Sequence, residues 1–115
     1  TRYDYLRIAK AMMDDWQKDT CVGKYLKDLA KNKIPKKRYI YEEQGFRFSS
    51  KSYAGQFYLD YLDLEERNIF GLDGYGGQNI MIDFDESRII VINTVHTNYD
   101  FKRLVLDVLK HGRIK

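Results

Sequence analysis

Glycines are concentrated in one short stretch of the chain, which reads Gly71-Leu72-Asp73-Gly74-Tyr75-Gly76-Gly77-Gln78. Strand-forming residues follow directly at 79–84, and a second run of them occupies 88–93 after a short turn. Glycine has no Cβ and is favoured where the backbone passes close to another group, so this stretch predicts a binding edge. It does not fit a phosphate-binding loop, because such a loop leads into a helix N-terminus, whereas here a strand follows.

Three other segments accompany the glycine run. The chain opens with Thr1-Arg2-Tyr3-Asp4-Tyr5-Leu6-Arg7, continues with Ser52-Tyr53-Ala54-Gly55-Gln56-Phe57-Tyr58, and closes with a helical pattern at 99–112. In order and spacing, these segments and the glycine run resemble the final part of the penicillin-recognising serine hydrolases, the superfamily of class C β-lactamases, D-Ala-D-Ala peptidases and 6-aminohexanoate-dimer hydrolase. The first segment is similar to the family's Ser/Thr-x-x-Asp-Leu-x-Arg pattern, and the second to its Tyr-Gly-Tyr-Gln-Trp-Trp strand. In many esterase-like members, a Gly-aromatic-Gly-Gly-Gln run replaces the usual Lys-Thr-Gly or His-Thr-Gly element.

The resemblance implies a substrate site along the glycine run. The backbone N–H of Tyr75 would be one of two oxyanion-hole donors, and the substrate-binding residues would be Gly74, Gly76, Gly77 and Gln78. Loss of one such donor costs on the order of 3 kcal/mol of transition-state stabilisation. Because no Lys or His stands where family members bind an anionic group, the resemblance favours an esterase or amidase over a β-lactamase. The alternative is that residues 74–77 form only a bulged hairpin edge.

The residues that would start this chemistry are missing from the chain. A hydrolase of this type needs Ser-x-x-Lys, in which the amine takes the hydroxyl proton, and a Tyr or Ser that relays the proton. No lysine stands three residues after any of Ser49, Ser50, Ser52 and Ser87. In the family these elements precede the matched region, so we expect a C-terminal piece of a longer hydrolase that is inactive alone. Its partners would be the missing N-terminal half and a small acyl substrate, and the alternative is a small self-associating α+β binding module.

Composition and charge argue against several other classes. Of the residues, 43% are hydrophobic and 32% are charged, and no apolar run approaches the ~20 residues of a membrane span. The net charge is +3, and most of the excess lies within residues 31–38. Pro35 interrupts this basic cluster, and Glu42 and Glu43 offset it, which favours a solvated loop over a nucleic-acid interface. We therefore predict no membrane or nucleic-acid partner.

The residue types that bind metals are too scattered to predict a metal or cofactor. Neither His96 nor His111 has a Cys or Asp partner at ligand spacing. The acidic group at 83–86 is expected to form a turn rather than a calcium site. Cys21 is the single cysteine, which excludes an internal disulfide, and we expect it to be a small buried helix residue.

Hydrophobic periodicity divides the chain into helices, a connector and strands. We expect two helices within residues 1–31, an irregular connector at 32–51, antiparallel strands within 52–95, and a C-terminal helix at 97–112 capped by Thr97 or Asn98. The expected strands are 53–62, 68–70 running into the glycine run, 79–84 and 89–95. The last strand is nearly all apolar, which predicts a central strand covered on both faces. The fold class is α+β, a single domain with an antiparallel sheet of three to four strands covered by helices.

Overall fold

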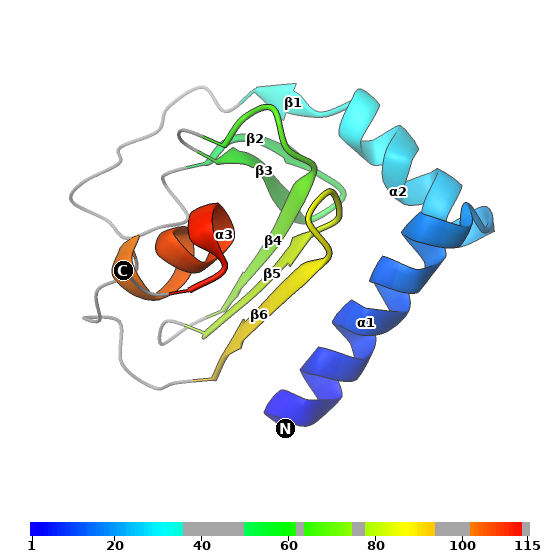
Figure 1. Cartoon of the computed structure of the whole chain (residues 1–115). Coiled ribbons are helices and arrows are strands. Elements are labelled where there is room, and N and C mark those ends of the chain that lie inside the picture. The colour runs from blue at the N-terminus through cyan, green and yellow to red at the C-terminus, as the bar shows by residue number, and fades with distance from the viewer. Residues whose placement is uncertain (36–49, 62–63, 75–77, 94–101, 114–115) are drawn as a thin grey trace.

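The computed structural model describes residues 1–35, 50–61, 64–74, 78–93 and 102–113. In chain order, the elements in these ranges are α1 (Arg2–Lys18), α2 (Cys21–Lys31), β1 (Ile34–Pro35), β2 (Ser50–Ala54), β3 (Phe57–Tyr61), β4 (Ile69–Gly74), β5 (Gln78–Asp83), β6 (Arg88–Ile92), the π-helical turn η2 (Lys102–Leu106) and α3 (Asp107–His111). The strands form one antiparallel sheet in the order β1-β2-β3-β4-β5-β6. Figure 1 shows α1 and α2 on one side of this sheet and α3 on the other. The predicted α+β class and antiparallel arrangement are confirmed, with six strands instead of three to four.

The stretch predicted as one strand at 53–62 is a hairpin of β2 and β3. Gly55 and Gln56 have φ angles of 53° and 73°, and the pair Ala54 and Phe57 closes the two-residue loop between them. Positive φ at both loop residues is the requirement of a type I′ hairpin turn, which suits the twist of the flanking strands. β1 adds a further strand from the predicted connector, with Ile34 opposite Tyr53.

Both N-terminal helices form as predicted. Thr1 caps α1 and makes a capping box with Asp4, while the hydroxyl of Thr20 caps α2 by accepting a bond from the N–H of Gly23 at 3.2 Å. Gly112 ends α3 in the left-handed conformation, with φ of 75°, as expected for a helix C-cap. The predicted caps of the last helix, Thr97 and Asn98, and the basic cluster beyond Pro35 lie outside the described residues.

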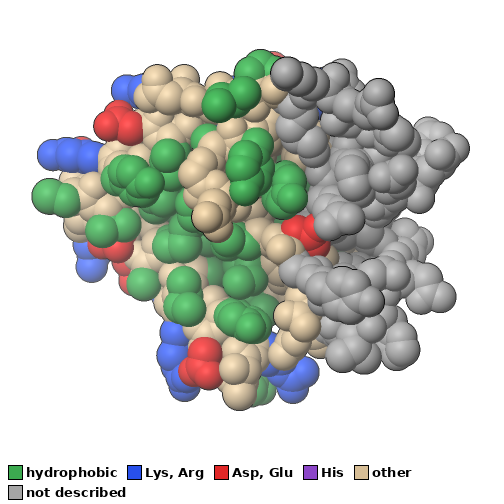
Figure 2. All heavy atoms as spheres, turned by 180° about the vertical axis from the view of Figure 1, so that it is seen from behind, with side chains coloured by type: hydrophobic (Ala, Val, Ile, Leu, Met, Phe, Trp, Pro, Cys, Tyr) green, Lys and Arg blue, Asp and Glu red, His purple; other side chains and the backbone are tan. Residues whose placement is uncertain are grey.

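Two hydrophobic cores occupy the two faces of the sheet. The core under α1 and α2 contains Ala9, Met13, Leu26, Ala54, Leu59, Phe70, Ile82 and Phe84. The core under α3 contains Tyr61, Leu64, Ile69, Met81, Val105, Leu106 and Leu109. Trp16 joins α1 to the first core, since its ring stacks on Phe84 with centroids 4.2 Å apart. Hydrophobic side chains also reach the surface, and Figure 2 shows them gathered in the middle of one face.

The predicted position of one strand and the predicted burial of Cys21 are wrong. The apolar strand β6 is the last strand of the described sheet and pairs with β5 alone, so it is not central. The predicted cover on both faces is present, because Ile89 packs against the core under α1 while Ile90 and Ile92 pack against the core under α3. Cys21 is exposed at the first position of α2 instead of buried.

Candidate functional site

The glycine run forms the end of the β4–β5 hairpin. Gly74 is the last residue of β4 and pairs with Gln78, the first residue of β5. Tyr75, Gly76 and Gly77 lie between them and outside the described residues. β5 pairs with β4 on one side and with β6 on the other, so the strand after the glycine run does not lie at an edge of the sheet, contrary to the prediction.

The first glycine of the run is required by an internal contact. A Cβ built on Gly71 would lie 1.8 Å from the Oη atom of Tyr61 and 3.1 Å from the Sδ atom of Met81. Both neighbours are fully buried in the core under α3. The prediction that the backbone passes close to another group is correct at this position, and the group is the side chain of Tyr61.

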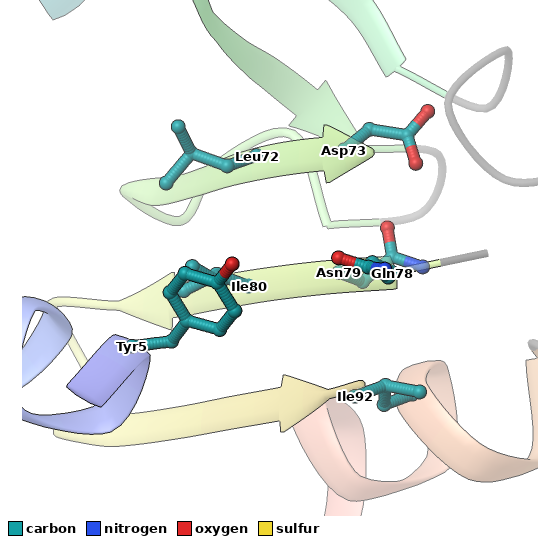
Figure 3. A pocket seen from close by; sticks show the side chains of 7 residues that line it. All are labelled: Tyr5, Leu72, Asp73, Gln78, Asn79, Ile80 and Ile92. Atoms are coloured by element: carbon teal, nitrogen blue, oxygen red, sulfur yellow. The ribbon is translucent and has the colours of Figure 1, made fainter. Parts of the chain in front are cut away.

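A pocket of about 160 Å³ lies beside the hairpin end, below the first turns of α1. Its described lining consists of Tyr5, Leu72, Asp73, Gln78, Asn79, Ile80 and Ile92. Figure 3 shows the polar residues of β4 and β5 at the hairpin end, with Leu72, Ile80 and the ring of Tyr5 farther from it. The pocket therefore has an apolar wall and a polar end that can donate and accept hydrogen bonds.

The charge at the polar end of the pocket comes from Asp73. Asn79 is almost completely buried, whereas Gln78 is half-buried, so the carboxamide of Gln78 is the more accessible of the two. Burial raises the pKa of the nearby Tyr61 phenol well above its ordinary value, and electrostatic interactions with Asp73 and Tyr58 raise it further. Tyr61 is therefore neutral at physiological pH. Among the described lining residues there is no cation to pair with an anionic ligand.

None of the described serines is placed as a nucleophile in this pocket. Ser50 and Ser52 are buried in β2, and the Oγ atom of Ser87 accepts a hydrogen bond from Gln17 at 2.8 Å in the β5–β6 turn. The described residues contain no cluster of three His, Cys, Asp or Glu side chains that could hold a metal ion. The described lining of the pocket has groups that can form hydrogen bonds and contains no Ser and Lys pair that could attack a substrate.

The acidic group at 83–86 forms the predicted turn and also holds α3. The Oδ1 atom of Asp83 accepts the backbone N–H groups of Asp85 and Glu86, each at 3.1 Å. Its Oδ2 atom pairs with Arg67, whose Nη2 also donates to the carbonyl of Leu109 at 2.6 Å. This network fixes the end of α3 on the sheet and lies away from the pocket lining.

Sequence reasoning found only part of the pocket. Gln78 was predicted and lines it, and Leu72 and Asp73 stand within the same run, where they could have been proposed from their position beside the glycines. Tyr5 could not be found from the run, because it reaches the hairpin only through the packing of α1 over β5 and β6. Its one signal is helical spacing, which places it four residues before Ala9 on the core side of α1.

Comparison of the chain with protein-family models, with curated proteins and with solved structures finds no match. In the described part of the chain, no helix has the length and hydrophobicity needed to cross a membrane. Any function for this chain therefore has to be argued from its own pocket and hairpin.

Proposed function

We propose that this chain is the substrate-binding C-terminal portion of a serine hydrolase of the β-lactamase type, with an esterase or amidase as the whole enzyme. The glycine hairpin and the adjoining pocket bind the acyl part of the substrate. The serine and lysine that carry the chemistry belong to polypeptide that precedes Thr1. The chain alone binds but does not hydrolyse.

The observation that supports this proposal most is the pocket at the hairpin end. Gln78, which the family resemblance implies as a substrate-binding residue, lines a pocket whose other wall is formed by Leu72 and Ile80. An acyl group offers a carbonyl for the polar end and a short apolar chain for this wall. Since one water molecule takes up about 30 Å³ in the liquid, a pocket of about 160 Å³ has room for a short acyl chain.

The pairing of β5 changes where the substrate would lie. Because both sides of β5 are occupied by other strands, a substrate cannot extend the sheet along residues 79–83. In the proposed enzyme the scissile carbonyl lies across the hairpin end, where the backbone N–H of Tyr75 would meet it. The described lining residues include no cation that would attract an anionic substrate, in agreement with an esterase or amidase.

Nuclear magnetic resonance on the isolated chain tests binding. Butyramide, an uncharged acyl compound that cannot be hydrolysed rapidly, should shift the amide signals of Leu72, Gln78 and Ile80 with a dissociation constant in the millimolar range. Ile80→Trp fills the pocket and should abolish these shifts. Tyr25→Trp is the matched control, because Tyr25 is 60% exposed on α2 and should leave them unchanged.

Hydrolysis of p-nitrophenyl butyrate tests whether the isolated chain is catalytically inactive, as proposed. The isolated chain should release no p-nitrophenolate above the rate of a heat-denatured sample, and a burst that is lost on replacing a serine would contradict the proposal.

The gene provides an independent test, because the reading frame upstream of Thr1 should encode Ser-x-x-Lys. A complete upstream sequence without this motif would overturn the assignment even if butyramide binds.

A further inference from the structure

The two edges of the described sheet differ in how well they are protected against pairing with another strand. At one edge, β1 has only two residues, one of which is Pro35, and the adjacent Lys33 forms an ion pair with Asp60 at 2.8 Å. Short length, proline and lysine are the devices by which proteins block an edge strand. At the other edge, β6 has five residues without proline or glycine.

The strand β6 also lacks a charge that would repel a partner. Arg88 is its one charged residue, and its Nη1 atom donates to the carbonyl of Leu109 at 2.8 Å, so the guanidinium is directed to α3. The other four residues are β-branched and apolar, and all five are half-buried. Both faces of β6 are covered by the two cores, and no strand of the described residues pairs with its side away from β5.

We propose that two copies of this chain pair through β6, antiparallel about a two-fold axis, to make one continuous sheet. The residues of β6 are compatible with antiparallel pairing against β6 of a second copy. With Ile90 on the axis, Ile90 faces itself, Ile89 faces Val91 of the other copy, and Arg88 faces Ile92. β-Branched residues then stand opposite each other on both faces, and no like charges are opposed.

A hydrophobic residue on α1 extends this interface. Leu6 shares one side of α1 with Met13 and Gln17 at helical spacing, and Gln17 is bonded to Ser87 in the turn that begins β6. Leu6 therefore lies on the side of α1 from which Gln17 contacts the turn that begins β6, and it is 42% exposed. In the two-fold pair, α1 of each copy lies on the same face of the joined sheet, where the two Leu6 side chains are covered.

Amide hydrogen exchange measured by nuclear magnetic resonance at several protein concentrations tests the pairing directly. Alternate amides of β6 point to β5, and the others point to the free edge. The first set should be protected at every concentration, whereas the second set should become protected only as the chain dimerises. Unchanged exchange of the edge amides would overturn the proposal, whether the chain stays monomeric or associates through another surface.

Sedimentation of two exposed-site variants provides the second test. Leu6→Lys should raise the dimer dissociation constant by about tenfold, because a lysine in place of a partly buried leucine loses roughly one to two kcal/mol of apolar burial. Val22→Lys is the matched control on α2, where Val22 is 50% exposed, and should leave the constant unchanged. Equal effects of the two substitutions would show that association does not use the β6 edge. Circular dichroism should show that both variants keep the fold of the original chain.

Discussion

The phenol of Tyr61 lies over the backbone of Gly71, so closely that a Cβ on this glycine would stand 1.8 Å from Tyr61 Oη. Gly71 is also the residue of β4 that pairs with Tyr58 of β3. The register between β3 and β4, in the described residues, consists of this one pair. The first glycine of the run therefore permits the two halves of the sheet to join.

Gly71→Ala should destabilise the fold by about 2 kcal/mol, because the new methyl group overpacks a fully buried site. Tyr61→Phe removes the atom that the methyl would meet first, so the cost of Gly71→Ala should be smaller in that background. Urea denaturation of the four proteins of this double-mutant cycle measures the coupling. Equal costs of Gly71→Ala in both backgrounds would show that the Tyr61 hydroxyl does not select the glycine.

Stability should fall at alkaline pH because of Tyr61. Burial raises the pKa of its phenol in the folded chain, so above about pH 10 the unfolded chain loses this proton while the folded chain keeps it. The contribution of Tyr61 to stability is complete below the pKa that its phenol has in the unfolded chain. It is lost as the pH rises towards the pKa of the phenol in the folded chain. In this range the original chain should lose stability more steeply than Tyr61→Phe, by about 1.4 kcal/mol per pH unit. If the free energy of unfolding falls equally with pH in both proteins, the effect does not come from Tyr61.

The parts of the fold that could be predicted from the sequence are those specified by residues close together in the chain. The helices α1 and α2 were predicted because their apolar stripes and their caps, Thr1 and Thr20, are contained in a few neighbouring residues. The run at 89–95 was placed at the centre of the sheet because apolar residues on both faces indicate coverage by helices, which an edge strand can also have. The position of a strand in a sheet depends on its neighbours, which periodicity does not specify.

The candidate site was predicted in part for the same reason. The glycine run identified the hairpin and Gln78, since both are encoded by consecutive residues. The role of Gly71 depends on Tyr61, and the pocket wall depends on Tyr5, which reaches the hairpin only when α1 packs on the sheet. The partners in these contacts are distant in the chain, so local sequence patterns do not identify which residues meet.

The missed turn between β2 and β3 suggests a stabilising substitution. Gln56 has a φ of 73° and is exposed, although glutamine has no feature that favours this left-handed conformation. Gln56→Asn should stabilise the chain by about 0.5 kcal/mol, because asparagine tolerates positive φ better. Gln56→Val is the contrasting variant and should destabilise it by about 1 kcal/mol, since a β-branched residue strongly disfavours this region. Thermal denaturation measures both, and the opposite order would contradict the turn assignment.

Arg67 should be the most sensitive cation in the fold. Asp83 is completely buried, and Arg67 is the cation that pairs with it, so Arg67→Gln leaves a buried carboxylate without its counter-charge. We expect a loss of about 3 kcal/mol, the lower part of the range for breaking a buried pair, because two backbone N–H groups still bond to Asp83.

Arg88→Gln is the matched control for this substitution. Arg88 donates to the same carbonyl of Leu109 but has no carboxylate partner within the described part of the chain, so its loss should cost only about 1 kcal/mol. Urea denaturation compares the two variants, and adding Asp83→Asn to Arg67→Gln should recover part of the loss because it removes the unpaired charge. If the two arginine variants are equally stable, the ion pair contributes little, and the bonds to Leu109 are what hold α3 on the sheet.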